Sequence, residues 1–390
     1  MRIIKFVDYY CKLVLTEIIK LVFIFPVKKK LFLFVSFDGK QYSCNPKYLS
    51  EAICKTEFFK DVKIVWAFRE PGNFNYLQRK GIKLVKYKSI KYIYYRLFSS
   101  VYITNIGEMP TLPTRSNQLY INTWHGGGAY KLCGVRNAIK YHDQYYVKKM
   151  RNSFSRATFF LSTCELASKE IFKESFLFRN KILEFGQPRN DIFFKTDNQK
   201  DIIDRVHKAF GIEADTKICL YAPTYREIGQ LFDSHLDYQE LKKCLKERFG
   251  GSWVVLYRSH QLLDNKEIKD NVISATNYPD MQELLVASDF FISDYSSSIW
   301  DYSFTYKPCL LFVPDLDKYV HDRDFYRPIV SWGFPMAKSN MEVQNLIKTF
   351  NMEEYRNNMI AHHNSYGSFE KGNATEKTLE LIMQHISHIS

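Results

Sequence analysis

Residues 290–298 read Phe-Phe-Ile-Ser-Asp-Tyr-Ser-Ser-Ser, and this stretch contains the transition that decides the fold. Its apolar beginning predicts a buried strand, Asp294 follows at the carboxyl end, and a helix is expected to begin among the three serines. Serine side chains cap the N–H groups of a helix start, and those donors together with the helix dipole bind anions. Simple capping is the alternative, but three serines after a strand-end aspartate favour a phosphate site.

The same alternation of apolar runs and helical stretches extends over most of the chain. A first series of buried parallel strands is expected at residues 31–37, 62–68, 82–87, 101–105, 119–123, 157–162 and 182–185. A polar stretch around residues 196–204 interrupts the pattern and predicts a domain boundary. A second series follows at residues 217–221, 253–257, 272–274, 290–293 and 309–313. The sequence therefore predicts an α/β protein of two doubly wound, Rossmann-like domains, at residues 31–195 and 196–365.

Composition limits the class of partner. The 390 residues include 55 Lys and Arg against 42 Asp and Glu, and the resulting net charge of +13 favours anionic partners. Nucleic acid, anionic lipid and phosphorylated substrates all qualify, but no RNA- or DNA-binding motif accompanies the charge, so no nucleic-acid partner is expected. The eight cysteines are scattered without a Cys-x-x-Cys pair, which indicates neither a disulfide framework nor a zinc site and favours a reducing cytosol.

Residues 1–30 predict an amphipathic, basic helix. Apolar residues recur at three- and four-residue steps, at Ile4, Val7, Cys11, Val14, Ile18, Leu21 and Phe25. Polar residues recur on the opposite face, at Lys5, Asp8, Lys12, Thr16 and Lys20. These charges leave no apolar run long enough to span a bilayer or to serve as a signal peptide. Pro26 is expected to end the helix before a basic cluster at residues 28–30, which favours an anionic membrane surface over packing on the helix's own domain.

Four further segments place polar residues after an expected strand or near the domain junction. Residues 123–128 read Thr-Trp-His-Gly-Gly-Gly; glycines permit close backbone approach to a ligand, and His125 could take up a proton near neutral pH. The segments 221–227 and 258–260 each contain an arginine, which can bind phosphate with two hydrogen bonds. The turn at residues 186–191 is weak by itself. A structural histidine, surface arginines and an ordinary turn are the alternative interpretations.

Together the five segments resemble the CDP-glycerol glycerophosphotransferase family of teichoic-acid and capsule synthesis. Its members share segments of the types Trp-His-Gly, Tyr-Ala-Pro-Thr-aromatic-Arg, Arg-x-His-Pro, Asp-Tyr-Ser-Ser and Gly-x-Pro-Arg-Asn-Asp. The likeness continues through Asn-Pro-Lys at residues 45–47 and through residues 307–319. It covers roughly residues 31 to 330 with the motifs in consistent order, which is far more specific than any single segment.

The resemblance implies an enzyme of GT-B type with two facing domains. CDP-glycerol would bind mainly the second domain, and a lipid-linked acceptor would approach across the first. An acceptor hydroxyl attacks the glycerol-bearing phosphorus, which forms a phosphodiester and expels CMP. The enzyme is then expected in the cytoplasm, peripheral on the inner face of the membrane. A C-terminal helix is expected within residues 366–390, with packing back on the first domain as one option, and the oligomeric state stays open.

The candidate site residues fall into three groups. His125 is expected to be the general base and His260 a second catalytic residue. Donor phosphate and nucleotide contacts are expected at Thr224, Arg226, Arg258, Asp294, Ser296, Ser297 and Ser298. Acceptor-side or supporting roles are expected for Trp124, Gly126, Gly127, Lys131, Arg189, Asn190, Asp191 and Asp301. The cationic side chains and the serine helix start could neutralise a pyrophosphate, so no metal or other cofactor is expected.

Three departures from the family pattern leave alternatives open. Residues 127–130 replace the usual Thr-Pro-Leu, Gln261 replaces the proline of Arg-x-His-Pro, and Asp324 stands where the family has glycine. CDP-ribitol could replace CDP-glycerol, because both donors use the same phosphate chemistry. A GT-B glycosyltransferase acting on a nucleotide sugar is a second possibility. A membrane-surface protein that binds anions without catalysis is the third.

Overall fold

The computed structural model describes residues 2–107, 109, 111–137, 144–197, 199–224, 236–259 and 272–389. Two compact units divide the chain, and each is described by itself. Unit 1 comprises Met1–His125, Cys133–Asp191 and Phe369–Ser390. Unit 2 comprises Gly126–Leu132 and Ile192–Ser368. The chain thus leaves unit 1 for seven residues directly after His125, and it returns to unit 1 at its C-terminal end.

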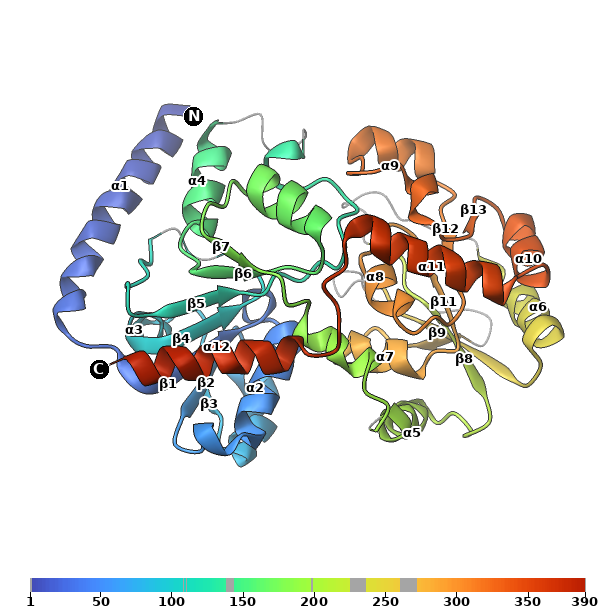
Figure 1. Cartoon of the computed structure of the whole chain (residues 1–390), viewed down its shortest axis with the longest axis horizontal. Helices are drawn as coiled ribbons and strands as arrows, with labels where there is room; N and C mark the ends of the chain where they lie inside the picture. Colours follow the sequence, from blue (N-terminus) through green and yellow to red (C-terminus); the bar gives the residue numbers. More distant parts are fainter. Residues whose placement is uncertain are drawn as a thin grey trace. The chain divides into compact units, whose positions relative to one another are not determined.

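In the described residues of unit 1, a parallel sheet has seven strands in the order β3-β2-β1-β4-β5-β6-β7 (Figure 1). The strands are β1 (Lys28–Val35), β2 (Lys63–Phe68), β3 (Lys83–Lys86), β4 (Ser99–Thr104), β5 (Leu119–Asn122), β6 (Phe159–Leu161) and β7 (Lys181–Leu183). Phe32 of β1 is in register with Ile64 of β2 and with Val101 of β4. The strand order therefore reverses between β1 and β4, where an open α/β sheet places its ligand crevice.

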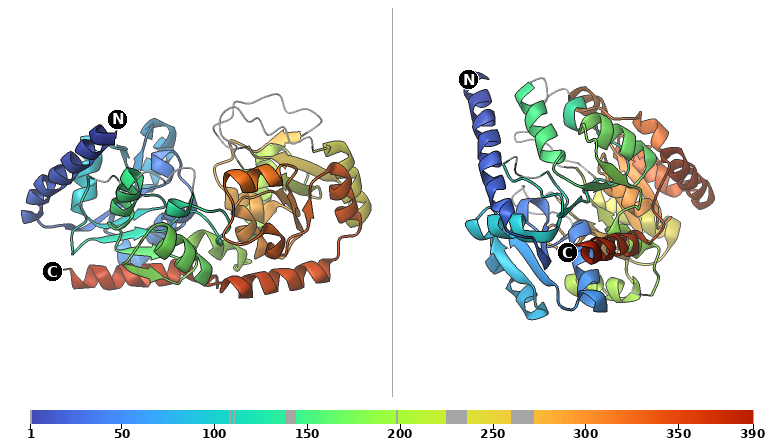
Figure 2. Two further views of the ribbon diagram at one scale, coloured as in Figure 1. Left: turned by 90° about the horizontal axis from the view of Figure 1, so that it is seen from above. Right: turned by 60° about the vertical axis from the view of Figure 1, so that its left-hand side comes forward.

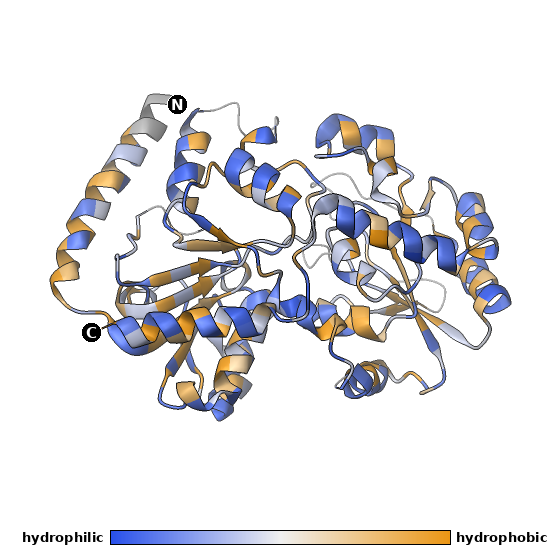
Figure 3. Cartoon of the chain, viewed as in Figure 1, coloured by the Kyte–Doolittle hydropathy of each residue, from blue (hydrophilic) through white to orange (hydrophobic). Residues whose placement is uncertain are grey.

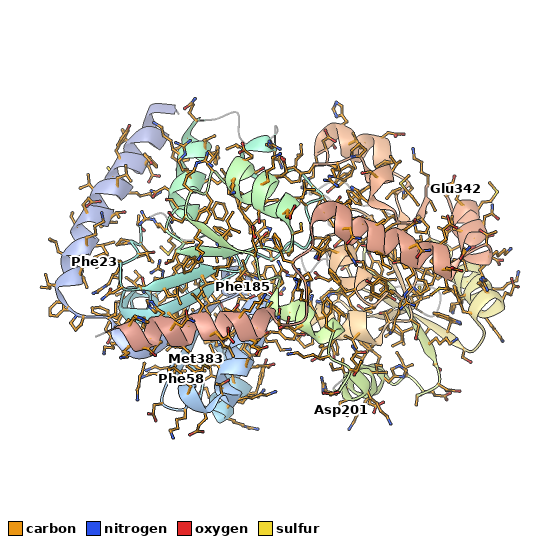
Figure 4. The ribbon with its side chains drawn as sticks, viewed as in Figure 1. Phe23, Phe58, Phe185, Asp201, Glu342 and Met383 are labelled. Atoms are coloured by element: carbon orange, nitrogen blue, oxygen red, sulfur yellow. The ribbon has the colours of Figure 1, made fainter. Side chains whose placement is uncertain are left out.

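The helical segments of unit 1 pack on the sheet or on one another. They are α1 (Arg2–Lys20), α2 (Cys44–Lys55), α3 (Ile90–Phe98), α4 (Gln144–Phe154), the π-helical segment η6 (Ala167–Ser175) and α12 (Ala374–His388). Helix α12, which ends at the label C in Figure 2, contacts α2 and contributes Ile382 and Ile386 to the core around Phe32. Met383 of α12 and Phe185, both labelled in Figure 4, pack against the same core. The C-terminal helix is thus part of the hydrophobic core of unit 1.

Unit 2 contains a second parallel sheet, which over the described residues has the order β10-β9-β8-β11-β12-β13. Its strands are β8 (Lys217–Tyr221), β9 (Trp253–Tyr257), β10 (Val272–Ser274), β11 (Phe290–Ser293), β12 (Cys309–Phe312) and β13 (Met336–Ala337). The first four have the bounds that their apolar runs predicted. For β8 and β11 the reason is burial on both faces, which demands a continuous apolar run. The two-residue strand β13 is too short to leave such a signal. The order reverses between β8 and β11, beside the opening motif.

The helices of unit 2 include one that begins at the predicted domain boundary. They are α5 (Gln199–Phe210), α6 (Tyr238–Phe249), α7 (Met281–Ala287), α8 (Ser298–Ser303), α9 (Leu316–Asp322), α10 (Asn340–Lys348) and α11 (Met352–Tyr366). The chain passes from unit 1 to unit 2 between Asp191 and Ile192, close to the predicted boundary, and the polar stretch around residues 196–204 is largely the beginning of α5. Ile202 and Val206 are buried at a spacing of four residues, so a narrow apolar stripe suffices to pack this polar helix, which contacts α7.

Helix α1 packs through its polar face. The Thr16 hydroxyl is buried and donates to the carbonyl oxygen of Thr111 (3.2 Å), and the Tyr145 hydroxyl donates to Asp8 (3.2 Å). The apolar side chains of Val14 and Ile18 are 61% and 56% exposed, and Figure 3 shows apolar residues recurring along the helix. An amphipathic helix normally packs with its apolar face against the protein core. Here that face is turned to the outside.

The basic residues 28–30, expected in the N-terminal helical segment, belong instead to the first strand of the sheet. The α-helix ends at Lys20, before a 3₁₀ turn (η1, Leu21–Ile24), rather than at Pro26. Residues 28–30 begin strand β1, where the Lys29 ammonium donates to the carbonyl oxygen of Ile389 (2.7 Å) and Lys30 pairs with Asp61 (2.8 Å). Strand pairing explains the difference. The apolar run that begins at Leu31 forms a buried strand, and the strand extends backward to include the three lysines. Across the described residues, none of the helices combines the length and apolarity needed to cross a bilayer.

Candidate active site

Asn105 joins the loops at the strand reversal of unit 1. It directly follows β4 and is completely buried. Its side-chain carbonyl accepts the backbone N–H of Phe37, after β1, at 2.9 Å, and its amide nitrogen donates to Ser36 Oγ at 3.3 Å. Its backbone carbonyl lies 2.8 Å from Nδ1 of His125, which follows β5. One residue therefore connects the carboxyl ends of three neighbouring strands.

The His125 ring is held in an orientation suited to a base. Because a carbonyl oxygen can only accept, Nδ1 carries the proton in the contact with Asn105, and the Nε2 lone pair is left as the proton acceptor. The ring packs against Phe37 and Trp124, with centroid distances of 5.4 and 4.2 Å. Phe37 and Trp124 both adopt left-handed backbone conformations, with φ of 45° and 54°. Such conformations cost about 1–3 kcal/mol each and persist where the surroundings enforce them.

Arg189 and Asn45 support the backbone on both sides of Trp124. The Arg189 guanidinium donates to the carbonyl oxygen of His125 (2.8 Å) and to the Cys44 sulfur (3.0 Å). Its backbone N–H donates to Asn45 Oδ1 (3.1 Å), and Asn45 Nδ2 donates to the carbonyl oxygen of Trp124 (3.2 Å). All of these partners belong to unit 1. Arg189 is thus a residue that positions the histidine loop.

Asn190 and Asp191, next along the same turn, have other partners. Asn190 Nδ2 donates to Glu370 (2.9 Å). The Asp191 carboxylate accepts the backbone N–H groups of Ala374 (3.0 Å) and Thr375 (2.8 Å), which are the first residues of α12. A carboxylate at a helix start satisfies orphan donors and complements the helix dipole. These two residues therefore attach the C-terminal segment to unit 1.

Asp294 makes the corresponding connection at the strand reversal of unit 2. It directly follows β11 and is completely buried. Its carboxylate accepts the Thr224 backbone N–H (2.9 Å) and hydroxyl (2.5 Å), and also the Tyr295 N–H (2.6 Å). Thr224 lies beyond the end of β8, so Asp294 joins the two strands that flank the reversal. These contacts make Asp294 a structural acceptor that shapes the edge of the sheet.

A pocket of about 380 Å³ opens beside this connection, entirely within unit 2. Its lining residues are Lys131, Ala222, Pro223, Thr224, Arg258, Ser259, Met281, Ser296, Ser298 and Arg323. Three of them are cationic, and none of those named carries a carboxylate. Ser296 Oγ accepts the backbone N–H (3.3 Å) and the hydroxyl (2.8 Å) of Ser298, so these serines also form the turn into α8. Ser297, between them, caps that helix without a side-chain hydrogen bond.

Arg258 is a fixed cation of this pocket. Its Nη1 donates to the backbone carbonyl oxygens of Ala275 (3.2 Å) and Tyr278 (2.8 Å). Burial lowers the pKa of Arg258 to about 10, against the opposing effects of Asp280 and Tyr278. The guanidinium therefore stays charged at neutral pH, and it braces the loop after β10 while it faces the pocket.

The glycines after His125 pack against protein. A Cβ on Gly127 would lie 2.5 Å from Cδ1 of Trp300 and 2.8 Å from an oxygen of Asp301. Asp301 is itself buried and accepts a hydrogen bond from Gln282 (3.0 Å). Residues Gly126 to Leu132 belong to unit 2, so Lys131, expected on the acceptor side, lines the cationic pocket instead. Close packing on α8, in place of the expected approach to a ligand, is the observed reason for Gly127.

Gly127→Ala is expected to destabilise the protein by about 1–3 kcal/mol, because the added methyl overlaps Trp300 and Asp301. Urea denaturation measures this change. Gly72→Ala is the matched control, since a Cβ at Gly72 has no heavy atom within 4 Å, and its stability should stay within about 0.5 kcal/mol of the parent. Equal stability of the two variants would contradict the packing role.

Some residues of the candidate site were not predicted from the sequence, and two residues that were predicted lie outside the described part of the chain. Arg226 and His260 lie outside the described residues, so their predicted roles stay predictions. Asn105 was predicted only as the last residue of a strand. Its position as a polar residue at the end of an apolar run could have identified it, because ligands of α/β proteins bind at the carboxyl ends of strands. Ser259 and Arg323 stand beside Arg258 and Asp324, in segments already noted from the sequence, but neither residue was predicted to contact a ligand. Across the described ranges, no cluster of three or more His, Cys, Asp or Glu side chains is arranged to hold a metal ion.

Comparison with known proteins matches these features to one family. The model of the CDP-Glycerol:Poly(glycerophosphate) glycerophosphotransferase family matches residues 17–384. A teichoic acid poly(glycerol phosphate) polymerase of Staphylococcus epidermidis is 31% identical, with 92% of this chain aligned to 51% of that protein. A polymerase of the same description from Bacillus spizizenii is 26% identical, over 94% of this chain and 95% of its own length. The chain therefore spans about half of one relative and nearly all of the other.

Solved structures and more distant relatives extend the match. The structure of the wall teichoic acid polymerase TagF superimposes with a TM-score of 0.80 at 28% identity, covering 93% of this chain and 90% of that one. Another structure of that polymerase was soaked with CDPG. Relatives described as teichoic acid ribitol-phosphate primase and polymerase also match. The likeness to TagF confirms the predicted pair of parallel-sheet α/β domains of GT-B type.

Proposed function

This chain belongs to the CDP-glycerol:poly(glycerophosphate) glycerophosphotransferase family, and we propose that it transfers glycerol phosphate from CDP-glycerol to a hydroxyl of a lipid-linked or polymeric acceptor. The observation that carries the proposal is the cationic pocket of unit 2, whose named lining residues include three cations and no carboxylate. A diphosphate requires such surroundings, because its negative charge must be matched by donors already in place. The Ser296 hydroxyl lines the same pocket and can add a hydrogen-bond donor for this group.

The proposed reaction is a direct displacement at phosphorus. The acceptor oxygen forms a bond to the glycerol-bearing phosphorus, and its proton passes to Nε2 of His125. The bond from that phosphorus to the bridging oxygen breaks, and CMP leaves with the electron pair. Phosphoryl transfer depends chiefly on positioning and charge neutralisation, which the pocket cations supply. We propose that no metal ion is needed, and strict dependence on a divalent cation would contradict this part.

Release of CMP tests the function directly. The protein is incubated with CDP-glycerol or CDP-ribitol and with lipid-linked acceptors that carry a terminal hydroxyl, and CMP is measured. CMP from CDP-glycerol is expected. CMP from CDP-ribitol alone would assign the ribitol alternative, and turnover of a nucleotide sugar would assign a glycosyltransferase. No CMP from any pair, while a known family member is active in the same assay, would sink the proposal.

We propose further that α1 binds the inner, anionic surface of the cell membrane. Two features of unit 1 support this: the exposed apolar face of α1 and a groove of about 530 Å³ beside it. Tyr10 and Leu13 of α1 line the groove together with the cations Lys148, Arg151 and Arg179. Apolar insertion and attraction to anionic lipid act together at such a surface. The same placement would bring a lipid-linked acceptor to the enzyme.

Replacing Val14 and Ile18 together by Glu is expected to weaken binding to vesicles of anionic phospholipid at least about tenfold. The reason is that each buried aliphatic side chain contributes about 1.5–3 kcal/mol when it leaves water. Vesicle sedimentation measures the effect. Val330→Glu is the control, because Val330 is 75% exposed in unit 2, outside this face. Unchanged binding by the double variant would contradict the membrane role, and CMP release with a water-soluble acceptor should persist.

A further inference from the structure

Two cations of the pocket, Lys131 and Arg323, belong to a pair of segments that form a short antiparallel ladder. This ladder is separate from both parallel sheets. Lys131 pairs with Phe325 in an antiparallel bridge. The Leu132 N–H donates to the carbonyl oxygen of Asp324 (3.1 Å), and the Tyr326 N–H donates to that of Tyr130 (2.8 Å). Lys131 and Arg323 both line the pocket. The ladder thus delivers two positive charges from segments almost 200 residues apart.

The ladder is anchored in an aromatic cluster of unit 2. Phe325 packs against Tyr295 and Trp332, with centroid distances of 5.6 and 5.0 Å. Tyr130 packs against Trp332 at 4.4 Å, and its hydroxyl lies 2.8 Å from Nε2 of the buried His362. Burial lowers the pKa of His362 to about 3, so its ring is neutral at neutral pH and can accept a hydrogen bond from the Tyr130 hydroxyl. The backbone that carries the two cations is therefore held from behind.

Asp324 explains how Arg323 leaves the ladder. Its backbone is left-handed, with φ of 57°, and its side chain accepts the Phe325 N–H at 2.7 Å. Aspartate tolerates this conformation better than most residues because it can bond its own backbone. The kink separates Phe325, which packs inward, from Arg323, which lines the pocket. The same backbone requirement accounts for aspartate at a position where the family has glycine.

We propose that Lys131 and Arg323 are the two cations that clamp the diphosphate of the donor. The inference rests on the proposed function and deepens it. The donor diphosphate carries two negative charges, and the ladder supplies two positive ones. Arg258 already donates through Nη1 to two backbone carbonyl oxygens, which fixes it to its own loop. Charge on the CMP phosphate grows as the bond breaks, so the clamp should act in the transition state as well as in binding.

The test compares ligands that differ in phosphate number. Affinities for CDP, CMP and cytidine are measured by calorimetry on the full chain and on Lys131→Met and Arg323→Met, which keep an unbranched aliphatic stem but remove the charge. Each variant is expected to lose at least about tenfold in CDP affinity, with a smaller loss for CMP and none for cytidine. Lys131→Arg should restore CDP affinity to within a few-fold. Lys318→Met, on the exposed face of α9, is the control.

The outcomes separate the inference from the proposed function. Unchanged CDP affinity in both folded variants, with an active parent, would overturn the clamp alone. An equal loss for cytidine and CDP would also overturn it, because the two residues would then shape the nucleoside site or the fold. A parent protein that neither binds CDP nor releases CMP from CDP-glycerol would instead overturn the proposed function. Selective loss of CDP affinity, with kcat for CDP-glycerol also lowered, supports both.

Discussion

His125→Ala lowers kcat by about 10²- to 10⁴-fold, the usual contribution of a positioned general base, and leaves CDP affinity within a few-fold of the parent. This expected result follows from the Nδ1 contact with the Asn105 carbonyl, which presents the Nε2 lone pair for the acceptor proton. The cationic pocket, where we propose that the donor binds, lies in unit 2 and does not include His125. CMP release under saturating CDP-glycerol measures kcat, and calorimetry measures binding.

Two further variants make the His125 prediction specific. His125→Gln keeps a polar side chain of similar reach but cannot act as a base near neutral pH, so it should be as inactive as the alanine variant. His321→Ala is the control, because the His321 side chain is 88% exposed on α9 and should leave kcat unchanged. Activity of His125→Gln near that of the parent would show that the ring orders the loop without accepting a proton.

Asp294→Ala is expected to lower the free energy of unfolding by about 2–4 kcal/mol and to abolish measurable CDP binding. The substitution removes the acceptor for the Thr224 N–H, the Thr224 hydroxyl and the Tyr295 N–H. A fully buried unpaired donor costs about 1–3 kcal/mol, and the two Thr224 donors cost less because Thr224 is only partly buried and water can reach it. The Thr224 edge of the pocket then loses its attachment to β11. Urea denaturation and calorimetry measure the two effects.

The control for this prediction is Asp317→Ala. The Asp317 side chain is 93% exposed and contacts Lys338 at 3.4 Å, a surface ion pair that contributes little to stability. Its removal should change the free energy of unfolding by less than about 0.5 kcal/mol. A similar small effect for Asp294→Ala would mean that the connection between β8 and β11 does not hold the pocket together.

The two strand reversals are built on the same plan. In each unit a buried Asn or Asp comes directly after the strand on one side of the reversal and accepts a backbone N–H beyond the strand on the other side. In unit 1 this residue is Asn105, whose carbonyl also orients a histidine; in unit 2 it is Asp294, beside a cationic pocket. The two units share this connection but differ in the side chains of the neighbouring loops: a histidine in unit 1 and the pocket cations in unit 2.

The five segments taken together, among them residues 123–128 and 290–298, predicted the family, which the match over residues 17–384 confirms. The sequence did not distinguish the roles of single residues within a motif. Arg189, Asn190 and Asp191 are consecutive, yet the first supports the His125 loop and the other two hold the C-terminal segment. A motif records which residue types stand together in the chain, whereas hydrogen-bond partners depend on segments that approach only after folding.

By itself the sequence determined the two parallel sheets and the loops that follow their strands, because burial on both faces demands continuous apolar runs and leaves the polar chemistry at strand ends. Only the tertiary structure decided which way each amphipathic or polar element faces. Periodicity gave α1 two faces, but packing on Thr111 and Tyr145 turned the polar one inward. Likewise, the bridge to Phe325 and the close approach of Gly127 to Trp300 place Lys131 at the cationic pocket of unit 2. The physical reason is that one local pattern is compatible with several long-range partners, and the free energy of packing selects among them.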